Sequence, residues 1–170
     1  MRSILCLLIW VSGLLYAQNI DVDSLFAYDI EFQNFINNSN PDSLDNIPPS
    51  WDSAWNYKNL GWISLDIRMY KGKNNSSKKP AIVFFPGGGW TSRSLNQYKQ
   101  YAYYFSRKGY STFSVTYRVF QDSSIVTPFD AVEDTKDALI HLRHNATKLE
   151  IDAQKIAGCG MSAGGHLISA

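Results

Sequence analysis

The chain has 170 residues, of which 45% are hydrophobic and 18% are charged, and this balance is typical of a globular protein and not of a disordered one. Its formal net charge of +1 gives no reason to expect nucleic acid or an anionic membrane surface as a partner. Cys159 is the only cysteine after residue 6, so no internal disulfide is expected once the first residues are removed.

The first 17 residues have the order of a secretory signal peptide. Arg2 is followed by an apolar run over residues 4–16 and then by the small residue Ala17. The run is shorter than the roughly 20 apolar residues that a membrane anchor needs. A buried helix is the alternative, but a polar stretch rich in Asn, Asp and Ser follows at once. We therefore expect cleavage near Ala17, a secreted or periplasmic protein, and no stable membrane anchor after signal removal.

Residues 18–59 are expected to form an irregular leader with a short helix at residues 24–36. The segment is rich in Asn, Asp and Ser, and prolines at positions 41, 48 and 49 interrupt it. Two interpretations stay open for Trp51, Trp55 and Trp62. They form an aromatic sugar-binding surface or, as is more common, they cap the edge of a core.

Residues 60–170 alternate between strand and helix patterns. The alternation of apolar and polar residues over 63–70 predicts a half-buried strand, and the continuous apolar run over 81–85 predicts a strand covered on both faces. A helix at 94–108 should stop at Gly109, and a strand at 110–117 follows. Thr127 and Asp130 form the capping pattern of a second helix, with Ala131, Thr135, Ala138, Leu142, Ala146 and Leu149 on one face. A short buried strand at 155–160 completes an α/β domain with a parallel sheet.

The sequence G-x-S-x-G occupies residues 160–164, between the last predicted strand and a new helix. This is the pattern of a nucleophile elbow, in which a sharp turn exposes a serine in a strained backbone conformation. Side chains two residues before and after Ser162 would collide in such a turn, and glycine removes them. The alternative is a small-residue turn that only permits close packing of helix and strand.

A second glycine motif, FFPGGGW at residues 84–90, follows the earlier buried strand. Three successive glycines let main-chain N–H groups turn toward an anion, as an oxyanion hole requires. A phosphate-binding loop is the rival interpretation, but no Lys-Ser/Thr pair follows the glycines. Together the two motifs favour an acyl-transfer site.

Four segments, AIVFFPGGGW, VTYRV, DAVEDTKDALIHLR and LEIDAQKIAGCGMSAGGHL, resemble the α/β-hydrolase superfamily. They are most similar to hormone-sensitive-lipase-like esterases and to bacterial carbohydrate acetyl and feruloyl esterases. The resemblance covers residues 62–170 and implies a three-layer sandwich with a mainly parallel sheet. It also implies Ser162 as nucleophile and an oxyanion hole built from the N–H groups of Gly88, Gly89 and Ala163. In these families a histidine usually precedes the glycines, and here Pro86 stands in its place.

None of the three histidines is expected to act as the catalytic base. His166 follows Ser162 by one helical turn and is assigned a structural role, because a triad base has to approach the serine from above the sheet. His141 and His144 are expected to face solvent. Cys159 is expected to pack in the buried strand and not to act as a nucleophile. No group of residues has metal-ligand spacing, and we expect no cofactor.

The eight residues after Ser162 contain no Asp or Glu, and their only histidine is His166, which is not expected to act as the base. We therefore expect the triad acid and histidine beyond residue 170, a fold truncated after the nucleophile elbow, and essentially no activity of this fragment alone. The resulting prediction is a secreted serine esterase acting through an acyl-enzyme on acetyl or feruloyl esters of polysaccharide. A small-ester or lipid carboxylesterase and a non-catalytic hydrolase-like carbohydrate-binding domain are the alternatives.

Overall fold

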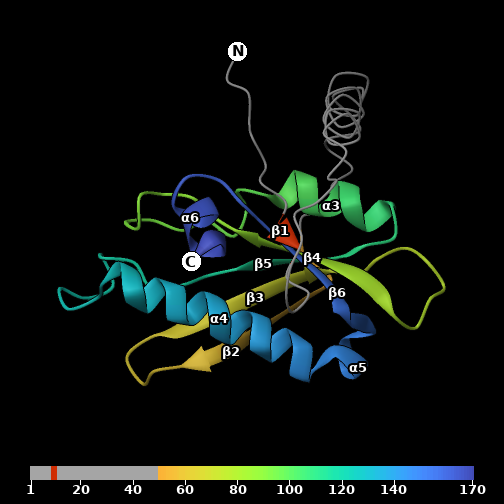
Figure 1. Ribbon diagram of the computed structural model, residues 1–170, viewed down its shortest axis with the longest axis horizontal. Coiled ribbons are helices and arrows are strands. Elements are labelled where there is room, and N and C mark those ends of the chain that lie inside the picture. Colours follow the sequence, from red (N-terminus) through yellow and green to blue (C-terminus); the bar gives the residue numbers. More distant parts are fainter. Residues whose placement is uncertain (1–8, 11–49) are drawn as a thin grey trace, which may run out of the picture. The chain divides into compact units, whose positions relative to one another are not determined.

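The computed structural model describes residues 9–10 and 50–170 (Figure 1). The helix expected at residues 24–36 and most of the signal segment lie outside the described residues. The strands are β1 (Ile9–Trp10), β2 (Ser53–Asn59), β3 (Ser64–Tyr70), β4 (Lys79–Phe85), β5 (Ser111–Val115) and β6 (Ile151–Gly160). The helices are α3 (Lys99–Arg107), α4 (Pro128–His144), α5 (Ala146–Leu149) and α6 (Ala163–Ser169).

The strands form one sheet in the order β1-β6-β4-β5-β3-β2. β4 pairs in parallel with both β5 and β6. Helix α3 connects β4 to β5, and helices α4 and α5 connect β5 to β6. β2 and β3 are antiparallel to each other because a short loop joins them, and β3 is also antiparallel to β5. β1 pairs antiparallel with β6 through Ile9 and Trp10. The predicted α/β fold is therefore confirmed, and its sheet is mixed, with parallel pairing confined to β5, β4 and β6.

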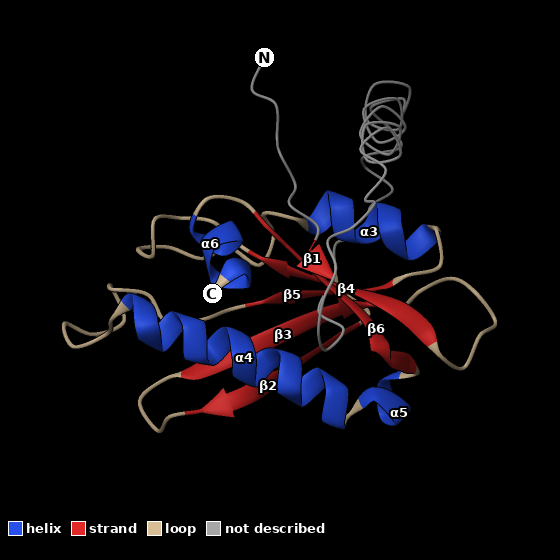
Figure 2. Cartoon of the chain, in the orientation of Figure 1, coloured by secondary structure: helices blue, strands red, loops and turns tan. Residues whose placement is uncertain are grey.

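Helices cover both faces of the parallel strands, with α3 on one side and α4 on the other (Figure 2). In β4, Val83 belongs to the core that contains Leu142 of α4. Phe84, on the opposite face, packs with Tyr98 and Ala102 on the α3 side. This two-sided cover is the physical reason why β4 reads as a continuous apolar run.

Helix α4 begins as the sequence predicts. The Thr127 side chain accepts a hydrogen bond from the Asp130 amide, and the Asp130 carboxylate accepts one from the Thr127 amide at 2.7 Å. The Thr127 hydroxyl also donates to the Asp130 carboxylate at 2.7 Å, and this bond, followed by the one from the Thr127 amide, holds the pKa of Asp130 below its usual value. The predicted continuous helix to residue 149 is interrupted at Asn145. The short helix α5 then ends at Leu149 and is followed by Glu150 in a left-handed conformation.

Residues 53–59 correct the expectation of an irregular leader, because they form β2 at the edge of the sheet. Trp55 and Tyr57 are half-buried against the core. Trp51 stacks on Tyr70 with ring centroids 4.4 Å apart. Two of the three tryptophans therefore pack on the edge of the core, whereas Trp62 is 52% exposed.

His141 corrects a second expectation, since it is half-buried and does not simply face solvent. The Trp55 indole N–H donates to His141 Nε2 at 3.0 Å and so fastens β2 to α4. Burial, followed by the nearby positive charges, lowers the pKa of His141, which keeps Nε2 available as an acceptor. His144 is exposed, as expected.

A buried carboxylate, Asp134 of α4, holds the segment that follows β5. Its side chain is fully buried and accepts from Arg118 Nε at 2.8 Å and from Arg118 Nη2 at 2.9 Å. The Arg118 main-chain N–H donates to the same carboxylate at 2.9 Å. Lys58 of β2 adds an ion pair with Asp134 at 2.7 Å. One carboxylate thus joins β2, α4 and the carboxyl end of β5.

Cys159 is buried in β6 and packs in the cluster that contains Ile82 and Phe84, as expected of a packing residue. Within residues 9–10 and 50–170, no helix combines the length and apolar character needed to span a membrane. In the same residues, the His, Cys, Asp and Glu side chains form no group that could hold a metal ion.

Candidate active site

The sharp turn between β6 and α6 places Ser162 at the carboxyl edge of the parallel strands. Its backbone has φ 55° and ψ −122°, a conformation that non-glycine residues rarely adopt. The residue is exposed. The predicted strand–turn–helix context and its backbone strain are therefore confirmed.

Two glycines of the motif are required by the close approach of neighbouring backbone. A Cβ on Gly160 would lie 2.6 Å from the Gly164 carbonyl oxygen. A Cβ on Gly164 would overlap the carbonyl oxygen of Phe85, the last residue of β4. The turn therefore packs directly against the end of β4, and a side chain at position 160 or 164 would displace the turn.

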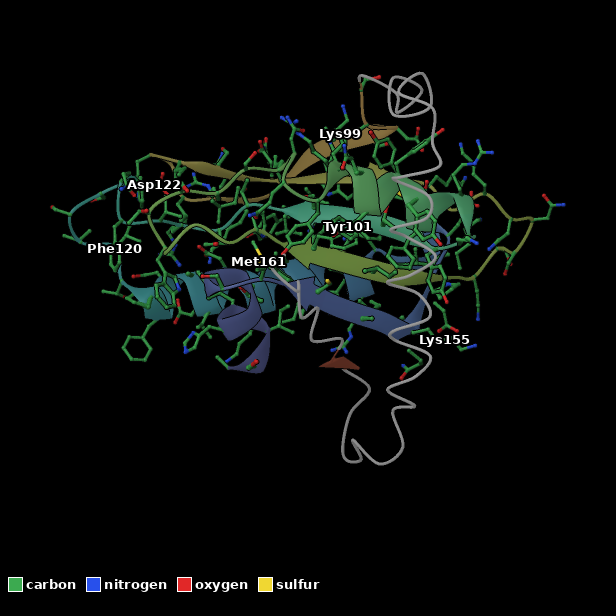
Figure 3. The ribbon with its side chains drawn as sticks, turned by 90° about the horizontal axis from the view of Figure 1, so that it is seen from above. Lys99, Tyr101, Phe120, Asp122, Lys155 and Met161 are labelled. Atoms are coloured by element: carbon green, nitrogen blue, oxygen red, sulfur yellow. The ribbon has the colours of Figure 1, made fainter. Side chains whose placement is uncertain are left out.

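The glycine-rich loop over residues 86–89 begins where β4 ends, beside this turn. A Cβ on Gly87 would lie 2.6 Å from the Met161 carbonyl oxygen and 3.5 Å from Ser162 Cβ, so the loop and the turn are in contact. Gly88 and Gly89 have φ values of 149° and 60°. In Figure 3, Met161 lies toward the end of the molecule that carries Phe120 and Asp122, and Lys155 lies toward the other end.

The three amides that the family resemblance assigns to an oxyanion hole have no acceptor among the described residues. The N–H groups of Gly88, Gly89 and Ala163 donate no hydrogen bond to any residue that the structure describes. Two nearby amides of the same segment are already used, because Gly164 N–H donates to Met161 O at 3.0 Å and His166 N–H to Ser162 O at 3.0 Å. Free donors therefore occur on both of the segments that meet beside Ser162.

No side chain in the described part of the chain is hydrogen-bonded to Ser162 Oγ. His166 lies in the first turn of α6, and its exposed ring meets the Trp90 ring edge-on at a centroid distance of 5.4 Å. This packing agrees with the structural role expected of His166.

Several residues around the loop were not singled out by sequence reasoning. Tyr117 donates a hydrogen bond to the Pro86 carbonyl, and Gln97 accepts one from the Gly87 amide at 2.7 Å. Arg93 forms an ion pair with Asp122 at 2.6 Å, which links the segment after the glycines to the segment after β5. The position of Tyr117 directly after a strand that ends at the site was a signal for its role, whereas nothing local marks Gln97.

The chain belongs to the BD-FAE family of α/β-hydrolases, whose sequence model matches residues 65–170. It is 36% identical over 110 residues to an arylesterase of Saccharolobus solfataricus. It is 29% identical over 94 residues to endo-1,4-beta-xylanase B of Butyrivibrio fibrisolvens. These stretches cover 62% and 55% of this chain.

Among solved structures, the chain is similar to a thermophilic esterase of Thermogutta terrifontis with butyrate bound. The TM-score is 0.65 and the sequence identity 35%, over 72% of this chain. The same esterase is also known in a form phosphonylated by cyclosarin. The match spans 44% of the butyrate-bound esterase, 34% of the arylesterase and 15% of the xylanase, less than half of each.

Proposed function

We propose that the protein hydrolyses carboxylic esters with Ser162 as the nucleophile. The observation that carries this proposal is the contact between the strained turn at Ser162 and a glycine loop whose Gly88 and Gly89 N–H groups donate to no residue that the structure describes. A rigid turn that exposes a hydroxyl beside preorganised donors suits attack on a carbonyl that becomes negatively charged. The family and the similarity to esterases support the same reaction class.

In the proposed reaction, Ser162 Oγ attacks the ester carbonyl carbon and gives its proton to a base. The carbonyl oxygen becomes an oxyanion, which accepts hydrogen bonds from the N–H groups of Gly88, Gly89 and Ala163. The alcohol leaves with a proton, and an acyl group stays on Ser162. Water then attacks the acyl-enzyme, which releases the acid and restores the serine. Residues 1–170 alone are proposed to turn over esters only at trace rates, since a serine hydroxyl without a base is a weak nucleophile.

For the substrate, we propose acetyl or feruloyl esters on polysaccharide. The BD-FAE family and the similarity to a xylanase support this choice. Small carboxylic esters are the second candidate, which the butyrate- and propionate-bound forms of the Thermogutta esterase favour. Comparison of kcat/KM on acetylated xylan, methyl ferulate and p-nitrophenyl butyrate distinguishes them.

The experiment that tests the reaction class is labelling with a fluorophosphonate probe. The full-length gene product should acquire one adduct, which peptide mass spectrometry should locate on Ser162. The phosphonylated Thermogutta esterase is the precedent for this chemistry in a similar protein. An adduct on another serine would refute the assignment, and a protein that neither reacts nor hydrolyses esters would support the non-catalytic binding domain.

We also propose that the protein is exported after cleavage near Ala17. The support is the order of Arg2, an apolar run and Ala17. Cleavage there would remove β1 from the edge of β6. Sequencing of the mature N-terminus should therefore find a residue close to position 18, and a mature protein that begins at Met1 would contradict export.

A further inference from the structure

We propose that Gln97 and Tyr117 are positioning residues that together hold one peptide plane and thereby aim the donors of the oxyanion hole. The inference rests on the proposed ester hydrolysis at Ser162. The glycines of the loop over residues 86–89 have no side chains that could hold the loop backbone in one orientation, so other residues have to do so. Neither residue needs to touch the substrate.

The two hydrogen bonds fall on opposite edges of the same peptide unit. Tyr117 donates to the carbonyl of Pro86, and Gln97 accepts from the N–H of Gly87 at 2.7 Å. This carbonyl and this N–H belong to the single peptide bond that joins Pro86 to Gly87. Because a peptide unit is planar, holding both of its edges fixes the plane against rotation. The next N–H along the chain is that of Gly88, the first proposed donor.

The carbonyl of Gly88, two residues after Pro86, is held in a different way. It accepts hydrogen bonds from the amides of Thr91 and Ser92 at 3.0 and 3.1 Å, and from Thr91 Oγ1 at 2.9 Å. These bonds orient the peptide that carries the N–H of Gly89, the second proposed donor. Three donors share this carbonyl, so the loss of one side chain leaves two in place.

The Pro86–Gly87 peptide has no such redundancy. The structure gives its carbonyl one hydrogen bond and its N–H one, among the described residues, and both partners are side chains. Tyr117 is fully buried, and burial raises the pKa of its hydroxyl to about 12, so the group keeps its proton and remains a donor. Pro86 has neither an N–H nor a polar side chain to orient the loop itself.

The Gly87 end of this peptide is also in steric contact with the turn that carries Ser162. A Cβ on Gly87 would lie 2.6 Å from Met161 O, so the loop backbone rests directly on the turn that carries Ser162. Rotation of the Pro86–Gly87 plane would therefore move the Gly88 N–H relative to the serine. Oxyanion donors act through their fixed orientation, and a small misplacement weakens transition-state binding more than substrate binding.

The test compares Gln97→Met with Gln100→Met in the full-length gene product. Both glutamines are exposed, and the Gln100 side chain makes no hydrogen bond to the described residues, so it is a matched control. We expect Gln97→Met to lower kcat for p-nitrophenyl butyrate about tenfold with KM within about twofold of wild type. The inhibition constant of an alkylboronic acid, which forms a tetrahedral adduct on serine, should rise by a similar factor. Gln100→Met should change neither value.

Tyr117→Phe supplies a second, independent variant. It should also lower kcat about tenfold at unchanged KM, and the double variant with Gln97→Met should lose less than the product of the two factors, because both bonds hold one peptide. Thr91→Val should stay within about twofold of wild type, since two amides still hold the Gly88 carbonyl.

Unchanged kcat and boronate affinity in Gln97→Met and Tyr117→Phe would overturn this inference while the wild type still hydrolyses esters through Ser162. A rise in KM at unchanged kcat would overturn it as well, since that result indicates a role in substrate binding. A wild type without labelling or activity at Ser162 would instead overturn the proposed function, and this assignment with it.

Discussion

Replacement of Ser162 by alanine should lower kcat for p-nitrophenyl acetate by about 10³-fold or more in the full-length gene product. The variant keeps the turn, the glycine loop and the amides of the proposed oxyanion hole, but it loses the oxygen that forms the acyl-enzyme. Residual hydrolysis then relies on binding and on the oxyanion hole alone, which by themselves still accelerate the reaction over water. KM should change little, because the hydroxyl contributes mainly to the transition state. The measurement is steady-state kinetics on the purified variant beside the wild type.

Ser169→Ala is a suitable control, because Ser169 lies on the helix that follows Ser162 and its hydroxyl donates to the Gly165 carbonyl at 3.0 Å. It should retain wild-type kcat. Full activity of Ser162→Ala would exclude the proposed mechanism.

Residues 1–170 assayed alone should show at most trace turnover, and His166→Ala should leave that rate unchanged. Robust turnover that disappears in His166→Ala would show that His166 acts as the base.

The second large effect is expected from Asp134→Asn, which should lower the free energy of unfolding by about 3–5 kcal/mol. The carboxylate is fully buried and accepts from the main-chain and side-chain nitrogens of Arg118 and from Lys58. An amide of the same size directs its NH2 group toward these donors and removes the fully buried partner of Arg118. The Arg118 side chain, which is 12% exposed, then keeps only Asp130 at 2.6 Å and the exposed Glu133 at 3.7 Å. Thermal unfolding should show a decrease in Tm of roughly 10 °C for a domain of this size.

Asp137→Asn is the matched control for this prediction. Asp137 pairs with Lys58 at 2.6 Å, but its side chain is 47% exposed. An exposed ion pair contributes about 0–1 kcal/mol, so this variant should unfold close to the wild-type temperature. A loss below about 1 kcal/mol for Asp134→Asn would contradict the assigned role of the buried network.

Local chemistry explains where sequence reasoning succeeded. Strand β4 has to be apolar on both faces because helices cover both, and Thr127 and Asp130 satisfy each other's backbone within four residues. The motif at Ser162 is equally local, since the glycines permit a strained turn within five residues. Such features depend on neighbours in the chain, so one sequence contains all the information that they need.

Features that depend on distant partners could not be found in this way. The strand β2 is polar and lies at an edge, and only its pairing with β3 and the half-buried Trp55 and Tyr57 makes it part of the sheet. His141 has the spacing of a surface residue, yet the indole of Trp55, 86 positions away, partly buries it. Helix periodicity describes one element and cannot indicate what another element places against it.

The α/β class, the strained turn with Ser162 and the glycines of the neighbouring loop can all be inferred from residues close together in the sequence. The contact between this loop and the turn, the pairing of Asp134 with Arg118, and the hydrogen bonds of Gln97 and Tyr117 to one peptide become visible in the folded chain alone. Local backbone conformation follows from neighbouring residues. The orientation of a peptide plane, in contrast, is fixed by partners that folding brings from elsewhere in the chain.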